Sequence, residues 1–318
     1  MSRIVYSPKY NIGFYGLEKL HPFDSKKYGR AWKLMRSRLG RRLSEMHVRP
    51  KRQASWDELL RVHSAEYLLK LKQPAYVARA LEVAPLRRLP GWMVDLHVLR
   101  PMRWATRGTI LAAEQAMQHG LAINLSGGYH HASPGRGEGF SVYADVGVAT
   151  ACLRKSGMLS EDARVLHIDT DAHQGNGVCR TFMDDQRAFI FDMFNSRIYP
   201  TDPDARRRID CELAIDSTTT DAEYMQLLES GLPGFLDSVS NAKVGIAFYN
   251  AGTDVYASDP LGQLNISAAT ILKRDVFVVD ELRKRGIPSV MVLSGGYTKE
   301  SYRLVADSVC ELVSKHAT

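Results

Sequence analysis

The sequence has few cysteines and no long hydrophobic run. Its four cysteines are scattered over 318 residues and form no Cys-x-x-Cys pair, which argues against a disulfide-stapled secreted domain and against a cysteine zinc site. No stretch approaches the roughly 18 consecutive apolar residues of a membrane-spanning helix, and the first residues lack the apolar core of a signal peptide. We therefore expect reduced, packed cysteines and a cytoplasmic protein, or a nuclear one if it acts in a eukaryotic cell or host.

Internal repeats, low-complexity segments and a recognisable linker are also lacking. The composition, 45% hydrophobic and 24% charged, is typical of a globular protein, and the length suits one large domain or two ordinary ones. Because no linker divides the chain, we predict a single domain over residues 1–318.

Acidic residues are scarce in one segment. Residues 26–52 contain eleven lysines and arginines and one acid, Glu45, in a chain of net charge +7. A solvated helix face explains such a run, and a patch for an acidic partner such as nucleic acid or anionic lipid is the alternative. No aromatic or glycine motif of a nucleic-acid module accompanies it, so we expect no sequence-specific nucleic-acid binding.

Strand-like and helix-like segments alternate along the rest of the chain. Apolar segments predict strands at 4–6, 122–125, 165–169, 189–192, 244–249 and 289–293. Amphipathic or capped segments predict helices at 28–39, from 55, and at 106–119, 146–155, 222–238, 270–285 and 301–314. The proline-marked segment 74–103 predicts a long irregular loop near a site. This alternation implies an α/β protein with a parallel sheet covered on both faces.

Polar clusters follow the predicted strands. They are Ser126-Gly-Gly-Tyr-His130-His131, Asp169-Thr-Asp171-Ala-His173, Asn250-Ala-Gly-Thr-Asp254 with Asp259, and Ser294-Gly-Gly-Tyr297. In an open α/β sheet the ligand site lies beyond the carboxyl ends of the strands. We therefore expect these clusters to converge on one crevice.

The residue types in these clusters suit metal-assisted hydrolysis. Two carboxylates and an imidazole, from Asp171, His173 and Asp259, would bind one zinc ion and leave a position open for water. His130 and His131 would flank that water.

Each of these two histidines needs a partner on its other ring nitrogen, for which Asp169 and Asn176 are the candidates. A histidine backed by a carboxylate is the more basic one, and one backed by a neutral amide keeps a pKa useful for proton transfer. Tyr297 could donate its phenol to the developing oxyanion.

These motifs resemble the zinc-dependent histone deacetylases, and their details are most similar to class IV. The resemblance is carried by residues 127–131, 169–177, 251–262 and 294–297, with support from 6–12, 16–23, 182–185, 198–200 and 273–275. It implies the arginase/deacetylase fold, which is a single α/β/α domain on a parallel eight-stranded sheet. It also implies zinc-dependent hydrolysis of N6-acyl-lysine in protein or peptide substrates.

The resemblance assigns a role to each motif residue. It makes Asp171, His173 and Asp259 the zinc ligands, His131 the general base and acid, His130 its electrostatic partner and Tyr297 the oxyanion donor. Gly139, Phe140 and Tyr199 would line the acyl-lysine channel, and the Gly128 carbonyl would meet the substrate or leaving group. A structural K⁺ or Na⁺ would lie at Asp169, Asp171, His173, Asp192 and Met193.

The chain departs from class I enzymes at two places. Asn176 stands where class I has an aspartate, a difference that class IV shares. The substrate-positioning aspartate of class I has no clear match in the loop 85–100, where Asp95 is the candidate. Class IV enzymes are associated with long fatty acyl groups, and the resemblance implies the same preference here.

Three alternatives remain open. A two-metal ureohydrolase of the same fold would need a carboxylate at Gly175 and an aspartate just after Asp254, where Val255 and Tyr256 follow instead. An amidohydrolase for small acylated amines such as acylpolyamines would use the same site. A non-enzymatic acyl-lysine reader or scaffold would keep the fold without turnover.

Overall fold

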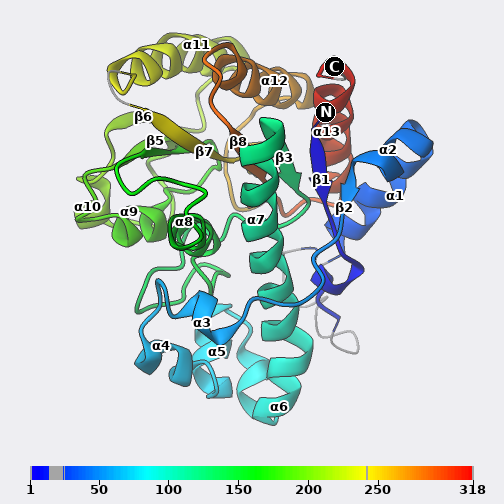
Figure 1. The fold of residues 1–318 in the computed structure, drawn as a ribbon, viewed down its shortest axis with the longest axis vertical. Coiled ribbons are helices and arrows are strands. Elements are labelled where there is room, and N and C mark those ends of the chain that lie inside the picture. Colours follow the sequence, from blue (N-terminus) through cyan, green and yellow to red (C-terminus); the bar gives the residue numbers. More distant parts are fainter. Residues whose placement is uncertain (1, 14–23, 25, 241–242, 317–318) are drawn as a thin grey trace.

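A parallel eight-stranded sheet forms the centre of the computed structural model, which describes residues 2–13, 24, 26–240 and 243–316 (Figure 1). The strand order is β2-β1-β3-β8-β7-β4-β5-β6, and every neighbouring pair is parallel. The strands are β1 (Arg3–Val5), β2 (His47–Val48), β3 (Leu121–Asn124), β4 (Arg164–Asp169), β5 (Ala188–Asn195), β6 (Cys211–Ile215), β7 (Val244–Asn250) and β8 (Ser289–Val292). The predicted α/β class with an eight-stranded parallel sheet is confirmed.

Helices cover both faces of this sheet. The longer ones are α1 (Lys27–Leu39), α7 (Arg100–His119), α8 (Asp145–Lys155), α11 (Asp221–Ser238), α12 (Ala268–Lys284) and α13 (Ser301–Lys315). The shorter ones are α2 (Arg41–Met46), α3 (Trp56–Leu59), α4 (Ala65–Lys70), α5 (Pro74–Ala80), α6 (Gly91–Val94), α9 (Asn176–Thr181) and α10 (Pro203–Arg206). Two 3₁₀-helices, η1 (Pro8–Tyr10) and η3 (Ala84–Arg88), and one π-helix, η4 (Asp95–Leu99), complete the set. None of the helices in the described part of the chain has the length and apolar character that crossing a membrane requires.

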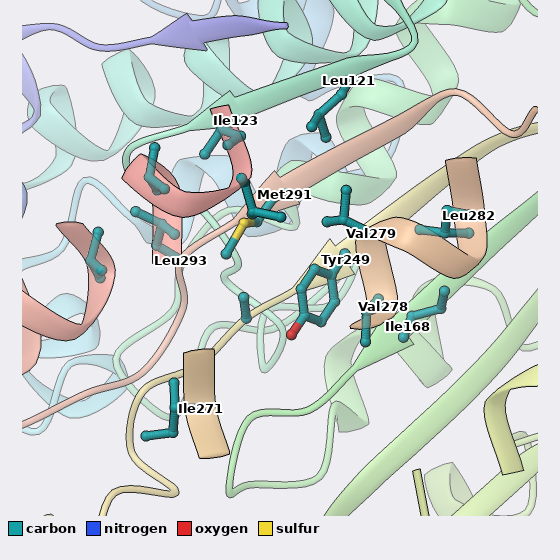
Figure 2. Close-up of a cluster of buried hydrophobic side chains, with 14 of the residues drawn as sticks. Leu121, Ile123, Ile168, Tyr249, Ile271, Val278, Val279, Leu282, Met291 and Leu293 are labelled. Carbon is teal, nitrogen blue, oxygen red and sulfur yellow. The ribbon is translucent and has the colours of Figure 1, made fainter. Parts of the chain in front are cut away.

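The two faces of the sheet bury two separate cores. Leu121 and Ile123 of β3 and Met291 of β8 point toward α12 and α13, as Figure 2 shows. Their neighbours in the strands, such as Ala122 and Val290, pack on the other side against α7 and α8. This alternation follows from the two-residue period of a strand. Because both faces are covered, the central strands carry apolar side chains on both faces.

Two strands escaped the sequence-based prediction. β2 has only two residues and β6 reads Cys-Glu-Leu-Ala-Ile, with polar and partly exposed positions. Both lie at the edges of the sheet. An edge strand with one open side lacks the continuous apolar run of a central strand.

The prediction of an irregular loop over 74–103 is wrong. The segment folds into α5, η3, α6 and η4, and α7 begins at Arg100 instead of near residue 106. Its prolines start helices rather than interrupt them: Pro74 occupies the first turn of α5, and Pro101 the first turn of α7. Proline suits that position because the first N–H groups of a helix have no intrahelical partner. The predicted capping box at Ser55 is present.

Candidate metal centre and active site

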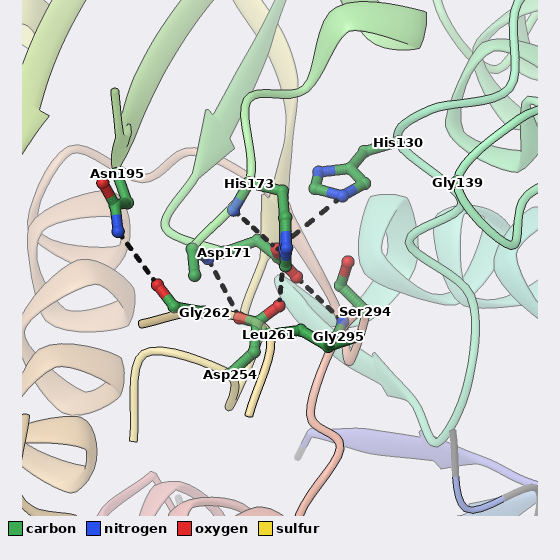
Figure 3. Close-up of polar contacts among 12 residues, drawn as sticks. His130, Gly139, Asp171, His173, Asn195, Asp254, Leu261, Gly262, Ser294 and Gly295 are labelled. Carbon is green, nitrogen blue, oxygen red and sulfur yellow. Dashed lines mark hydrogen bonds and ion pairs between the residues drawn. The ribbon is translucent and has the colours of Figure 1, made fainter. Parts of the chain in front are cut away.

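Four loops that leave neighbouring strands build the candidate site (Figure 3). The strands β3, β8, β7 and β4 are adjacent in the sheet, and each is followed by one of the polar clusters. All four loops leave from the same edge because the strands are parallel. Side chains that are distant in the sequence therefore meet in one buried site.

Asp171, His173 and Asp254 form the tightest group of metal-ligating side chains in the described part of the chain. Their candidate ligand atoms lie within 4.8 Å of one another, and all three residues are buried. His173 Nδ1 is 3.1 Å from Asp171 Oδ1 and 3.0 Å from Asp254 Oδ2. Figure 3 shows these side chains pointing toward one another. Carboxylate oxygens and an imidazole nitrogen are ligands that zinc accepts.

Electrostatics favours a cation at this group. Burial by itself would raise the pKa of Asp171, but His130 and His173 hold it well below its usual range. Burial would lower the pKa of His173, but Asp171 and Asp254 raise it to about 10. Burial and the Asp171 carboxylate raise the pKa of Asp254 to about 7. A divalent ion would offset the negative charge of these buried carboxylates, and it therefore fits this donor set.

Asp259, the third ligand that the resemblance implies, lies outside this tight group. Its Oδ1 accepts hydrogen bonds from the backbone N–H of Leu261 at 3.0 Å and Gly262 at 3.1 Å. Its Oδ2 accepts from the N–H of Tyr297 at 2.7 Å. Asp259 as a ligand stays a prediction. Sequence reasoning did not choose Asp254 as a ligand because two aspartates follow β7, and spacing alone does not say which one reaches the metal.

The loop after β8 closes over these carboxylates. The Gly295 N–H donates to Asp171 Oδ2 at 2.8 Å. A Cβ atom at Gly295 would collide with the carboxylates of Asp254 and Asp171. The glycine therefore allows the backbone to approach the acids directly.

The tandem histidines each have a different partner. His130 Nδ1 lies 2.8 Å from Asp169 Oδ2, and His131 Nδ1 lies 2.8 Å from Asn176 Oδ1. Asn250, which belongs to a predicted polar cluster but was assigned no role from the sequence, donates to both oxygens of Asp169 at 3.0 and 2.9 Å. Its position as the last residue of β7 was the available signal.

These partners separate the proton affinities of the two rings. Burial would lower the pKa of His130, but Asp169 and Asp171 raise it to about 9. Burial, followed by the charges of His130 and His173, lowers the pKa of His131 well below its usual range. His130 is therefore the ring that carries a proton and His131 the neutral one, and the pKa of His131 lies below the range that the sequence led us to expect.

A cavity of about 120 Å³ opens beside these groups. Its polar end includes the tandem histidines with Gly128, Gly139, Phe140 and Tyr297. The Tyr297 ring lies 6.2 Å from the His173 ring and 5.8 Å from the Phe140 ring. The other wall is apolar and comes from the helical segment 74–103, through Leu81, Val83, Leu86, Val98 and Met102. The expectation that this segment lies near a site agrees with that lining.

The remaining channel candidates are placed as follows. The Tyr199 ring lies 5.2 Å from the His131 ring and is 44% exposed, so it stands where the site meets solvent. The Gly128 carbonyl accepts a hydrogen bond from Ser294 Oγ at 2.9 Å. Asp95 binds Arg103 through both carboxylate oxygens, at 2.7 and 3.0 Å, and does not line the cavity.

Lys27 is a buried part of the site that sequence reasoning missed. Its Nζ donates to the carbonyl oxygens of Ser294, Gly295 and Gly296 at 2.9, 2.8 and 3.2 Å. Burial lowers the pKa of Lys27 to about 8, against the opposing charges of Asp254 and Asp171. Nothing in the sequence distinguishes it from the other lysines and arginines of residues 26–52. No contact in the described residues tests an acidic partner for that segment.

Two of the residues expected at a monovalent cation, Asp169 and Asp192, adjoin one small cavity, and the cation site stays a prediction. Asp169 and Asp192 are register partners on β4 and β5, and both are buried. Asp192 Oδ2 accepts from the Gly175 N–H at 2.9 Å, while its Oδ1 has no hydrogen-bond partner among the described residues. A cavity of about 20 Å³ adjoins both carboxylates, which is room for one small ion or water. Met193 is buried in the apolar core.

Comparison with known proteins gives one family. The family described as histone deacetylase domain matches residues 21–313. Histone deacetylase 2 of Arabidopsis thaliana is 44% identical over 306 residues, which cover 96% of this chain and 77% of the plant protein. The acetoin utilization protein AcuC of Staphylococcus xylosus is 25% identical over 299 residues, 89% of this chain and 74% of that protein.

A solved structure shows the same fold. The crystal structure of the HDA15 HD domain superposes with a TM-score of 0.75 at 17% identity, covering 98% of this chain and 90% of that chain. This likeness confirms the deacetylase-type fold.

Proposed function

Because the chain belongs to the histone deacetylase family, we propose that it uses one zinc ion to hydrolyse the amide bond of N6-acyl-lysine in proteins. The observation that carries the proposal is the buried Asp171–His173–Asp254 group beside two separately partnered histidines. Asp171 and His173, with Asp259 or Asp254, would hold the ion. When bound, zinc supplies a Lewis acid for the amide carbonyl and for the attacking water.

The side chains around that position divide the proton transfers. His131 takes a proton from the water at Nε2, because its Nδ1 faces Asn176, and gives it to the departing lysine amine. His130, held by Asp169, keeps a positive charge that stabilises the developing anion. The Tyr297 phenol donates to the oxyanion from the opposite side. Gly139 and Phe140 flank the aliphatic part of the lysine.

The apolar wall supports an acyl group longer than acetyl. Its aliphatic side chains come from residues 81–102 and line the same cavity of about 120 Å³ as the histidines. An engineered apolar cavity of about 150 Å³ in another protein holds benzene, so this space exceeds the needs of one methyl group. Each methylene buried there contributes about 0.8 kcal/mol. A preference for fatty acyl groups agrees with the class IV resemblance.

The proposal is tested with lysine peptides that carry acetyl, octanoyl or myristoyl groups, assayed with and without a chelator and with added zinc. We expect kcat/KM to rise with acyl length, chelation to abolish turnover and zinc to restore it. Turnover of acylpolyamines alone would favour the small-amine alternative. About two tightly bound catalytic ions per chain would favour a ureohydrolase.

Two tyrosine variants distinguish an enzyme from a catalytically inactive acyl-lysine-binding scaffold. Tyr297→Phe should lower kcat by about 10²–10³, the range for loss of one oxyanion donor. Tyr302→Phe, on the surface of α13 beside Arg303, should leave kcat unchanged. Peptide binding without turnover in the unmodified protein would make the chain an acyl-lysine reader.

We also propose that the protein belongs to class IV, that it is located in the cytoplasm or the nucleus, and that residues 26–52 bind an acidic partner. Affinity for anionic partners that survives Arg41→Glu with Arg42→Glu would remove the last of these proposals.

A further inference from the structure

Two carboxylates lie behind the histidine that transfers protons. The Asn176 side chain faces His131 with its oxygen and turns its amide nitrogen to Glu138 and Asp202. Nδ2 of Asn176 is 3.1 Å from Glu138 Oε1 and 3.5 Å from Asp202 Oδ2. Its Oδ1 is 2.8 Å from His131 Nδ1. Asn176 is buried, so water does not compete for these positions.

The direction of this amide decides which nitrogen of His131 is basic. An amide oxygen accepts only, so His131 must carry its proton on Nδ1 and leave the Nε2 lone pair free. If the amide were reversed, its NH₂ would face Nδ1, and the neutral ring would carry its proton on Nε2. In that state the ring could not accept a proton from water at Nε2. An aspartate at this position would avoid the ambiguity, because both of its oxygens accept.

The far side of Asn176 resolves the ambiguity. Ionised carboxylates accept hydrogen bonds and cannot donate, so Glu138 and Asp202 both select the NH₂ end of the amide. Arg136 lies 2.6 Å from Glu138 Oε2, and Arg180 binds both oxygens of Asp202 at 2.8 and 2.7 Å. Burial raises the pKa of Asp202, but the Ala205 N–H and Arg180 hold it below its usual value.

Both acids are held by their own backbone surroundings. Asp202 also accepts from the Ala205 N–H at 3.1 Å as the cap of α10. Glu138 exchanges two backbone hydrogen bonds with Ser141, at 3.0 and 2.9 Å, around the turn that carries Gly139 and Phe140. Each carboxylate therefore approaches Asn176 from a fixed position.

We propose that Glu138, assisted by Asp202, is a positioning residue that sets the His131 tautomer by orienting the Asn176 amide. The inference rests on the proposed function, in which His131 accepts the proton from water. It assigns a role to an acid outside the metal group and outside the tandem histidine motif.

The test combines kinetics with a tautomer measurement on the zinc-loaded protein. Glu138→Met removes the acceptor at similar size, and we expect kcat to fall about 10-fold with KM within two-fold, a part of what a general base contributes. In ¹⁵N-histidine spectra, the His131 signal, identified by its loss in His131→Gln, should shift from the Nδ1–H toward the Nε2–H tautomer. Glu138→Gln keeps the shape and should give a smaller change if Glu138→Met does not fold.

Asn176→Asp provides the decisive background. With a carboxylate at 176 the direction no longer matters, so adding Glu138→Met should cause no further loss of kcat. Glu212→Met is the matched control, because Glu212 lies on β6 and pairs with Arg206 of α10. It should change neither kcat nor the His131 spectrum.

An equal loss of kcat with and without the Asn176→Asp substitution, or an unchanged His131 spectrum in Glu138→Met, would overturn the inference. The spectrum needs no substrate. If the unmodified protein does not hydrolyse acyl-lysine, the proposed function is wrong. The effect of Glu138 on the His131 tautomer can still be measured in that case.

Discussion

Lys27 is a lysine without exposed surface, and its ammonium group donates to the loop after β8. Its Nζ bonds three successive carbonyl oxygens just before Tyr297. Tyr28 reinforces the same loop, because its phenol donates to the Ser294 carbonyl at 3.0 Å. A single cation from α1 thus organises the backbone on which the candidate oxyanion donor is mounted.

Replacing Lys27 should affect catalysis more than binding. Lys27→Met leaves buried carbonyl groups without their donor, at a cost of about 1–3 kcal/mol each when unsatisfied. We expect lower stability and a loss of kcat of at least 10-fold with KM little changed, measured by steady-state kinetics and denaturant unfolding. Lys27→Arg, which keeps several donors, should recover part of the kcat.

Lys33→Met serves as the control, because Lys33 is exposed on the same helix. Equal effects of the two methionine variants on kcat would show that the Lys27 contacts do not position the loop.

At the scale of elements, His63 joins the helical segment to the loops around the site. It lies between α3 and α4, and its Nε2 accepts from the Ala144 N–H at 3.0 Å. Its Nδ1 lies 3.3 Å from the Pro134 carbonyl and so carries the proton. Burial lowers the pKa of His63 to about 4. The neutral ring is therefore the form that fits between these elements.

This arrangement makes the fold acid-sensitive in a defined range. The folded pKa of His63, about 4, lies below the unfolded value of about 6.5, so the unfolded chain binds the extra proton. The contribution is complete above pH 6.5 and is lost as the pH falls toward 4. We expect this group to reduce the free energy of unfolding by about 2 kcal/mol between pH 7 and pH 5, measured by urea unfolding at both values.

His63→Gln should be less stable at pH 7, because packing against Tyr67 and Tyr143 is lost, yet should show a smaller drop between the two pH values. His97→Gln, at a partly exposed position in η4, should keep the full drop. An unchanged drop in His63→Gln would assign the acid sensitivity to other groups.

At the scale of the whole molecule, the candidate metal group ties the carboxyl ends of the central strands together. Asp171 and His173 follow β4, Asp254 and Asp259 follow β7, and the loop after β8 hydrogen-bonds to both Asp171 and Asp259. These side chains come together only in the folded chain, so an ion that needs all of them binds the folded state. It therefore stabilises the whole domain according to its free concentration and affinity.

Zinc should raise the melting temperature, and a chelator should lower it. At a free zinc concentration about 100 times Kd, the stabilisation is about 2.7 kcal/mol, which calorimetry with and without chelator can measure. Asp171→Asn should abolish the rise. We expect Asp259→Asn to abolish it as well, as the family resemblance predicts, and Asp254→Asn only to reduce it.

The reverse order of the last two variants would make Asp254 the third ligand. Asp237→Asn, whose carboxylate pairs with Arg285 on the surface, is the control and should keep the full rise.

The amino-acid sequence by itself determined where the central strands and most long helices lie along the chain. It also determined the polar clusters at the strand ends. Those clusters can be recognised in the sequence because a buried parallel strand is a largely apolar run, and the polar residues at its end mark the edge of the sheet. Asp169 at the end of β4, Asp171 and His173 just after it, and His130 with His131 after β3 were all predicted in this way.

Only the tertiary structure decided the contacts that join distant segments. The bonds from Lys27 to Ser294–Gly296, the choice of Asp254 as the neighbour of His173, and the approach of Glu138 to Asn176 have no local signature. The helices within 74–103 and the edge strands β2 and β6 were missed for a related reason. Their apolar faces are recognisable only against the elements they pack on, because periodicity reports local geometry and a packing partner comes from elsewhere in the chain.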